Sequence, residues 1–163
     1  MTEPVALSTD AVDAVAALAR TVWQVTYPGL ITQAQIDAML ADRYAPERIR
    51  AQLDDPTHAW RVVPAAGTPL GFAHAVLGGS DCKLDKLYVH PQHQRRGHGA
   101  ALVHAIETWA RDRHATRLHL QVNRRNEGAI RAYERYGFRI VEARVFDIGG
   151  GFVMDDYVME KAL

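Results

Sequence analysis

A run of glutamine, arginine and glycine at residues 94–99 follows a strand-like segment and leads directly into a helix-like one. Its sequence is Gln94-Arg95-Arg96-Gly97-His98-Gly99. The first turn of a helix presents backbone N–H groups without intrahelical partners, and the aligned peptide dipoles add partial positive charge there. Glycines let a ligand approach the backbone, and arginines bind anions. The run therefore predicts a phosphate-binding loop that suits a diphosphate.

Two familiar phosphate motifs do not fit this loop. A dinucleotide-binding fingerprint requires a third glycine where the chain has Leu102. A P-loop requires Gly-Lys-Ser/Thr, whereas Gly97 is followed by His98-Gly99-Ala100. Taken alone, the run is equally consistent with a turn that carries solvated charge, so its surroundings must decide.

A second block of chemically useful residues lies some thirty positions further on, at 120–138. It reads Leu120-Gln121-Val122-Asn123-Arg124-Arg125-Asn126-Glu127-Gly128-Ala129-Ile130-Arg131-Ala132-Tyr133-Glu134-Arg135-Tyr136-Gly137-Phe138. Asn123 or Asn126 can cap the helix that follows, and Gly137 can end that helix in the left-handed conformation. Helical spacing places Ala129, Ile130 and Tyr133 together on the inner face.

Together the two blocks resemble the GNAT acetyltransferase superfamily. The first matches its Val-x-Pro break, here Val89-His90-Pro91, followed by Gln/Arg-x-x-Gly-x-Gly/Ala. The second matches its strand, Asn-rich turn, Ala-x-x-x-Tyr helix and Gly-Phe exit. The resemblance extends over essentially the whole chain. It implies an α/β (α+β) fold with a mixed, mostly antiparallel central sheet flanked by helices, in one domain spanning residues 1–163.

Apolar patterns predict the elements that would position these blocks. Strands are expected at residues 4–7, 60–63, 70–77, 82–89, 116–122, 138–146 and 152–160. Helices are expected from a Ser8 or Thr9 cap to about Thr26, at 33–43, from Pro46, from the glycine loop to Arg113, and before Gly137. Strict alternation in the strand 82–89 would place Leu84, Lys86 and Tyr88 on one face, and Asp85, Leu87 and Val89 on the other.

The resemblance also implies how acetyl-CoA would bind. The strand backbone before the break would pair with the pantetheine arm, the loop would hold the pyrophosphate, and Asn126 would contact the arm. The cofactor-binding residues expected on this basis are Leu87, Tyr88, Val89, Gln94, Arg95, Arg96, Gly97, His98, Gly99, Ala100, Asn126 and Tyr133.

Acyl transfer to an amine needs a proton donor for the leaving thiolate and a proton acceptor for the amine. Tyr133 matches the family's general acid, with core packing as the alternative role. Asp85 is the predicted base, although a salt bridge with Lys83 or Lys86 is equally consistent with its position. His74 on the neighbouring strand is the second choice.

The acceptor site is expected among the first helices and the last strands, at Trp23, Tyr27, Asp155 and Tyr157. These segments resemble a bacterial branch that acetylates polyamines and other small amines, and aromatic rings with carboxylates suit an alkylammonium group. The predicted enzyme is an acetyl-CoA-dependent N-acetyltransferase of a small-molecule primary amine, which releases CoA. Two alternatives stay open: acetylation of a protein N-terminus or lysine, and a CoA-binding sensor without turnover.

Composition narrows the remaining possibilities. The 163 residues have a formal net charge of zero, 48% hydrophobic and 23% charged residues, which does not favour a nucleic-acid partner. No leader or membrane-length apolar run is evident, and the single Cys82 excludes an internal disulfide, so a cytoplasmic protein is expected.

His90, His93 and His98 do not favour a metal site, because the loop is better explained by cofactor binding. A homodimer is left open.

Overall fold

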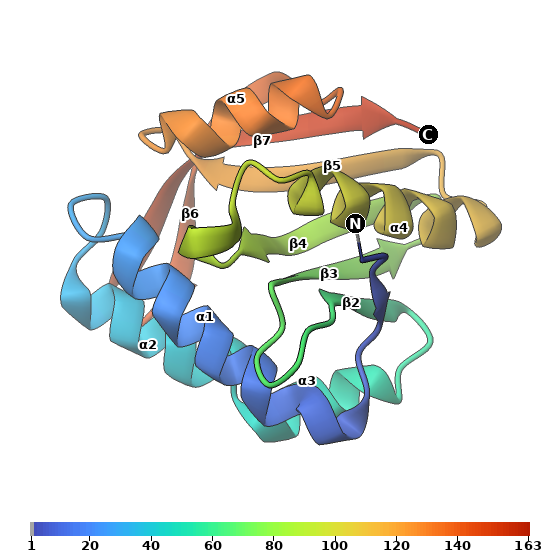
Figure 1. Cartoon of the computed structure of the whole chain (residues 1–163). Helices are drawn as coiled ribbons and strands as arrows, with labels where there is room; N and C mark the ends of the chain where they lie inside the picture. Colours follow the sequence, from blue (N-terminus) through green and yellow to red (C-terminus); the bar gives the residue numbers. More distant parts are fainter. Residues whose placement is uncertain (1) are drawn as a thin grey trace.

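A seven-stranded sheet forms the centre of the computed structural model, which describes residues 2–163 (Figure 1). The strand order is β1-β2-β3-β4-β5-β7-β6. The strands are β1 (Val5–Ala6), β2 (His58–Val63), β3 (Gly71–Gly78), β4 (Asp81–Val89), β5 (Arg117–Asn123), β6 (Arg139–Gly149) and β7 (Phe152–Ala162). Every pairing is antiparallel except that of β4 with β5. The α/β fold with a mostly antiparallel sheet is therefore confirmed.

Helices cover both faces of this sheet. Helices α1 (Val12–Thr26), α2 (Gln33–Arg43) and α3 (Pro46–Leu53) lie together on one side, and α4 (His98–Asp112) and α5 (Glu127–Arg135) lie on the other (Figure 1). The apolar stripe of α4, which includes the fully buried Leu102 and Ile106, packs on one core. A second core joins α1 to Trp60 and Phe72 of the sheet. Each amphipathic helix thus buries its stripe against one sheet face.

The predicted helices and strands form, with most ends shifted by one or two residues. One helix start differs in kind: a 3₁₀ turn at Thr9–Ala11 precedes α1, and the Ser8 side chain makes no capping hydrogen bond. Pro46 begins α3 at its first turn, as expected, because proline lacks the N–H that a helix start leaves unpaired. Gly137 ends α5 in the left-handed conformation, with φ 98°.

The alternation predicted for β4 is wrong at Asp85. Lys86 pairs with His74 of β3 while Leu84 pairs with the next residue, Ala75, so Asp85 is an extra residue in a β-bulge. Leu84 packs in the core beneath α4, whereas Lys86 and Tyr88 lie on the opposite side of the sheet, near the aromatic rings that α1–α3 cover. The bulge therefore places Leu84 on the opposite face of the sheet from Lys86 and Tyr88, whereas strict alternation predicted all three on one face.

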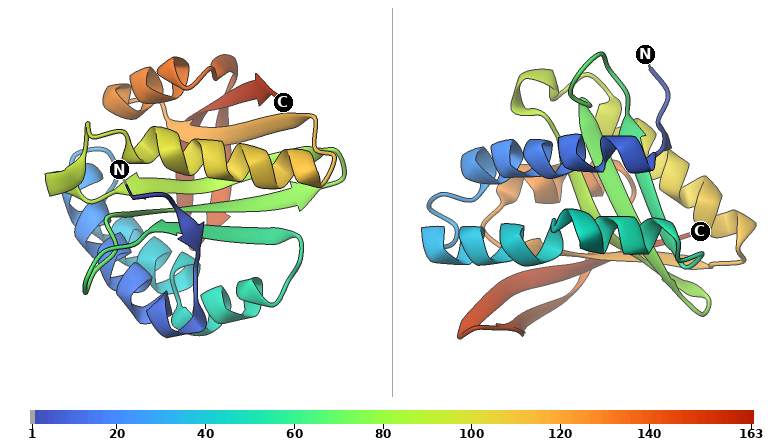
Figure 2. Two further views of the ribbon diagram at one scale, coloured as in Figure 1. Left: turned by 45° about the vertical axis from the view of Figure 1, so that its right-hand side comes forward. Right: turned by 90° about the horizontal axis from the view of Figure 1, so that it is seen from below.

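Beyond the bulge, β4 and β5 separate. The two strands pair only from Asp81 to Lys83, opposite Arg117 to His119, while β5 continues along β7 as far as Asn123. The edge of β4 that follows Lys83 is consequently left without a strand partner. Figure 2 shows the same sheet from two further sides, with the β6–β7 hairpin extending away from the helices. Within residues 2–163, no helix has the length and apolar character needed to cross a membrane.

Candidate functional site

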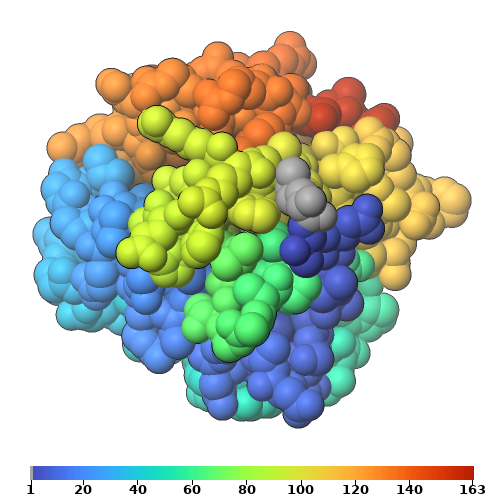
Figure 3. All heavy atoms as spheres, viewed as in Figure 1, coloured from blue at the N-terminus to red at the C-terminus, as the bar shows by residue number. Residues whose placement is uncertain are grey.

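A cleft of about 630 Å³ lies where β4 separates from β5. Its walls are the free edge of β4, the loop that follows it, and the inner side of α5. On the surface, the residues after β4 (yellow-green) lie between α1 (blue) and α5 (orange) (Figure 3). Of the residues predicted to bind the cofactor, all line the cleft except Arg96 and Ala100. Arg96 is exposed, with a guanidinium nitrogen 3.4 Å from Nδ1 of His93.

The loop is shaped to present backbone N–H groups to this cleft. Gly97 is the N-cap of the 15-residue helix α4 and has φ 86°. Arg95 also has a left-handed backbone, with φ 63°, a conformation that non-glycine residues rarely adopt and that often marks binding sites. Nδ1 of His98, on a side chain only 7% exposed, has no hydrogen-bond partner in the described chain. The loop thus offers helix N–H groups, an arginine and an unpartnered imidazole nitrogen to an anion.

Close packing sets the shape of the same loop. A Cβ atom on Gly99 would lie 2.6 Å from the hydroxyl oxygen of Tyr136, which is well inside van der Waals contact. Only glycine fits there without displacement of Tyr136. The loop and the free strand edge together suit a diphosphate joined to an extended amide chain, because the strand edge can accept such a chain as an added strand.

Two residues of the second sequence block also reach the cleft. The Oδ1 atom of Asn126 accepts a hydrogen bond from the backbone N–H of Ala129 at 3.3 Å, so Asn126 caps α5 while lining the cleft. Tyr133 projects from the inner side of α5, and burial raises the pKa of its phenol well above 10. The phenol therefore stays protonated at neutral pH and is available as a hydrogen-bond or proton donor.

A second, narrow cavity of about 40 Å³ adjoins the cleft on the α1–α2 side. Four residues line both spaces: Tyr27, Asp85, Tyr88 and Gln121. Aromatic rings form one wall, where the hydroxyl groups of Tyr27 and Tyr88 are 2.7 Å apart and Trp23 Nε1 donates to the Tyr44 hydroxyl at 3.1 Å. Trp23 and Tyr27, both predicted to bind the acceptor, are thus in the wall of this cavity.

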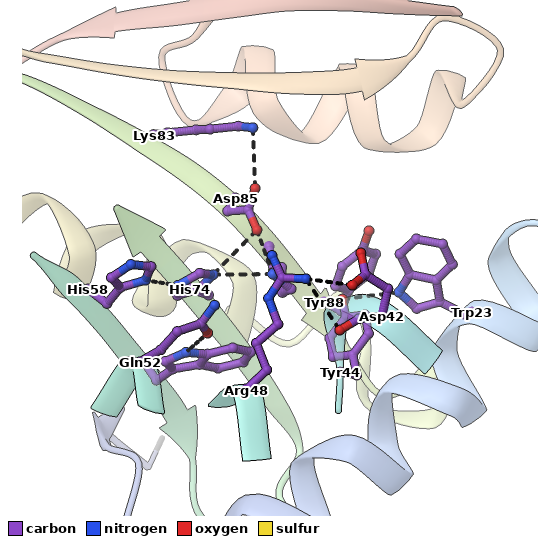
Figure 4. Close-up of polar contacts among 12 residues, drawn as sticks. Trp23, Asp42, Tyr44, Arg48, Gln52, His58, His74, Lys83, Asp85 and Tyr88 are labelled. Atoms are coloured by element: carbon purple, nitrogen blue, oxygen red, sulfur yellow. Dashed lines mark hydrogen bonds and ion pairs between the residues drawn. The ribbon is translucent and has the colours of Figure 1, made fainter. Parts of the chain in front are cut away.

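Asp85 lies at the junction of the two spaces, but it is surrounded by positive charge. Its carboxylate is 2.5 Å from Nζ of Lys86, 3.3 Å from Nζ of Lys83 and 3.4 Å from Nδ1 of His74 (Figure 4). Burial alone would raise the pKa of Asp85, but the hydrogen bond with His74 and the lysine charges hold it well below its usual range. A carboxylate held ionised in this way is a weak proton acceptor.

His74 is buried and belongs to the same network. Its Nε2 atom is 2.8 Å from Nδ1 of His58, and Figure 4 shows the two rings side by side beyond Asp85. Burial lowers the pKa of His74 to about 4, so its ring is neutral at neutral pH. His74 does not line either of the two spaces and acts within the protein as a neutral partner of Asp85 and Lys86.

Asp156 is the other carboxylate that lines the narrow cavity, and its surroundings are different. It projects from β7, is only 2% exposed, and its Oδ1 atom has no hydrogen-bond partner among the described residues. Burial raises its pKa to about 6. Near neutral pH this group is therefore mostly ionised, unpaired, and a better proton acceptor than Asp85.

The neighbours of Asp156 on β7 lie outside both spaces. Asp155 is half exposed, with Oδ1 3.3 Å from a guanidinium nitrogen of Arg124, and the same guanidinium stacks over the ring of Tyr157. The structure therefore does not bring Asp155 or Tyr157, both predicted to bind the acceptor, to the cavity. The sequence placed Asp156 in a segment expected to bind the acceptor, but Asp155 was chosen there, and Gln121 was assigned no role. Polar and apolar residues alternate along β5, and the polar series Arg117, His119, Gln121 and Asn123, which continues to the end of the strand, was a usable signal for a cavity wall.

In the part of the chain that the structure describes, no three His, Cys, Asp or Glu side chains come together as metal ligands.

Comparison with known proteins bears on what this arrangement does. Residues 21–138 match the Acetyltransferase (GNAT) family. An "uncharacterized N-acetyltransferase" of Mycobacterium tuberculosis is 33% identical over 156 residues, which covers 95% of this chain and 99% of that protein. A spermidine N(1)-acetyltransferase of Thermoplasma acidophilum is 22% identical over 159 residues, covering 95% and 93%. The crystal structure of PaiA N-acetyltransferase from Thermoplasma acidophilum with coenzyme A is similar to the whole chain and to 99% of that protein, with a TM-score of 0.87 at 22% identity.

The two cavity carboxylates should affect stability in opposite directions. Asp85→Asn leaves two lysines without a counter-charge and should destabilise the fold by about 3–5 kcal/mol. Asp156→Asn should stabilise it by roughly 1–3 kcal/mol near pH 8, because the raised pKa means that ionising this carboxylate costs folding free energy. Denaturant unfolding checks both.

The pH dependence of unfolding further distinguishes Asp156→Asn from Asp85→Asn. Because the folded pKa of Asp156 lies above its unfolded value, the gain from Asp156→Asn should be full above about pH 7 and vanish near pH 4. A loss of stability in Asp156→Asn near pH 8 would mean that this carboxylate has a partner.

The loop geometry predicts a selective loss of ligand affinity. Gly97→Val forces a β-branched residue into a left-handed conformation at the start of α4 and should weaken coenzyme A binding at least tenfold, measured by calorimetry. The matched control is Gly67→Val, which has nearly the same backbone conformation, φ 85°, in the β2–β3 turn away from the cleft. Equal affinity in both variants would remove the loop from the binding site.

Proposed function

The chain belongs to the GNAT acetyltransferase family and is an N-acetyltransferase, and from this premise we propose that it transfers the acetyl group of acetyl-CoA to a primary amine of a small molecule. The observation that carries the proposal is the unpaired edge of β4 beside the glycine loop, with a polar cavity opening from the middle of that edge. A donor laid along the edge would place its reactive end where the two spaces meet, at Asp85 and Gln121.

The donor would be held mainly by backbone groups. Backbone groups of Leu87–Val89 on the free edge of β4 are available to bind a pantetheine arm, and the N–H groups at the start of α4 to bind the diphosphate. Acetyl-CoA, when bound, supplies the thioester carbonyl that the amine attacks. A carbon–nitrogen bond then forms, the carbon–sulfur bond breaks, and CoA leaves as the thiol.

The proton transfers fall to two residues on opposite sides of the junction. An amine is mostly protonated near neutral pH and must lose a proton before it attacks. In this proposal Asp156 replaces Asp85 as the proton acceptor, because its carboxylate is unpaired and its pKa is about 6. Tyr133, across the cleft on α5, donates a proton to the leaving thiolate.

The acceptor cavity favours a small molecule. Its aromatic wall of Trp23, Tyr27, Tyr44 and Tyr88 suits the alkyl part of an amine and the face-on approach of an ammonium group. Its volume of about 40 Å³ has room for the amine end of an acceptor and not for a folded partner. Polyamines meet the requirements of size and aromatic contact, and the resemblance to a spermidine acetyltransferase is the reason to include them among the acceptors tested.

Turnover with a panel of acceptors tests the proposed function. Thiol release from acetyl-CoA should rise at least tenfold above the hydrolysis background with one or more small amines, and less with peptides or aminoglycosides. Tight binding of acetyl-CoA without thiol release for any acceptor would contradict the proposal and favour a CoA-binding sensor. Release with peptides alone would favour protein acetylation.

The proposed acid can be tested against its neighbour. Tyr133→Phe should lower kcat about 10²- to 10⁴-fold with unchanged coenzyme A affinity, since it removes one proton donor and little volume. Tyr136→Phe is the matched control, because it removes a neighbouring phenol of the same cleft, whose hydroxyl lies against Gly99. If Tyr133→Phe retains full kcat, the phenol has no part in proton transfer.

A further inference from the structure

The charges that line the acceptor cavity do not suit an acceptor that carries only positive charge. Three cationic residues, Arg43, Lys83 and Lys86, line it against two carboxylates, Asp85 and Asp156. A polyamine would bring further positive charge into a space with a cationic excess. The like-charge repulsion would act at short range and in a partly dehydrated site, where it is least screened.

Existing ion pairs leave two of these charges free. Asp85 is shared by the two lysines, at 2.5 Å from Lys86 and 3.3 Å from Lys83. Lys86 is further enclosed by the rings of Tyr44 and Trp60, which lie 5.4 and 5.5 Å from its Nζ. These groups satisfy one another and are poorly available to a ligand.

Arg43 is the free cation. It is the last residue of α2 and is partly exposed at the cavity wall, and its guanidinium has no ion pair within residues 2–163. The acid next to it in sequence, Asp42, is instead paired with Arg48 at 2.8 Å. The planar fork of an unpaired arginine matches a carboxylate or phosphate.

Asp156 is the free anion, and it lies deeper. Its side chain is 2% exposed and its Oδ1 atom is unpartnered, whereas Arg43 is partly open to solvent. A ligand that satisfies both would place an ammonium group inside, next to Asp156, and an anionic group nearer the surface, next to Arg43. The small size of the cavity requires the two groups to be only a few bonds apart.

We infer that the acceptor is a primary amine that also carries an anionic group close to the amine, as an amino acid does, with Arg43 as the residue that selects it. The inference rests on the proposed function and specifies its substrate class. Binding of the donor's diphosphate does not explain why Arg43 is unpaired, because Arg43 does not line the donor cleft.

Matched acceptors test the inference directly. The enzyme is assayed with amino acids of varied side chain and with the corresponding amino acid amides, which keep the size and remove the anion. Two further acceptors, 2-aminoethyl phosphate and ethanolamine, compare a phosphate with its neutral counterpart, and spermidine represents the polyamines. The expected result is a kcat/KM at least tenfold higher for an anionic acceptor than for its neutral counterpart.

Variants of Arg43 distinguish a role in binding the anionic group of the acceptor from a general effect on the fold. Arg43→Gln should lower kcat/KM for each anionic acceptor at least tenfold more than for its neutral counterpart, and leave coenzyme A affinity unchanged. Arg43→Lys should restore part of the preference, since it keeps the charge without the fork. Circular dichroism and unfolding of each variant check that the fold is intact.

The outcomes distinguish the inference from the proposed function. Preferred turnover of the neutral amines or of spermidine would overturn the inference and leave the proposed function standing. If acetyl-CoA binds and no acceptor is turned over, the proposed function fails, and calorimetric titration with the amino acids and their amides decides the inference alone. Binding of an amino acid that is lost in Arg43→Gln supports it, and equal or absent binding of both overturns it.

Discussion

A bulge at Asp85, whose carboxylate is paired with the buried Lys86, lies where the sheet opens and where the chemistry is proposed. Asp85 is the extra residue of a bulge, and bulges increase the local twist of a strand and redirect its side chains. The bulge lies just beyond the last β4–β5 pairing, at Lys83, so the strand turns away from β5 with a free backbone edge. The donor cleft and the acceptor cavity both lie at this separation, and Asp85 lines both of them.

The environments of the two cavity carboxylates push their pKa values in opposite directions. Asp85 gains two lysines and a neutral histidine, so it stays ionised and serves to neutralise buried charge. The Oδ1 atom of Asp156 has no hydrogen-bond partner, so the desolvation of this carboxylate lowers the stability of the fold. A carboxylate that lowers stability and faces a cavity has the properties expected of a group kept for function, because a neutral side chain would serve the fold better.

Features governed by local geometry could be predicted from the sequence, and features governed by strand pairing could not. Gly97 and Asn126 act on their own helix ends, so their roles follow from residue type and spacing. The face that Asp85 presents depends on a bulge, which alternation does not reveal. Asp155 and Asp156 are adjacent on one strand, and only the pairing of β7 with β5 determines which of them faces the cavity. Similarly, an arginine in the last turn of a helix gives the same local pattern whether it is solvated or lines a cavity, as Arg43 does.

A crystal structure of the protein with coenzyme A would show where the donor lies relative to the separated strands β4 and β5. The pantetheine amides should be hydrogen-bonded to the β4 backbone between Leu84 and Val89, with the diphosphate on the N–H groups at the start of α4 and the thiol at the junction near Asp85 and Tyr133. Coenzyme A bound elsewhere, with the free edge of β4 paired to β5 along its whole length, would contradict it.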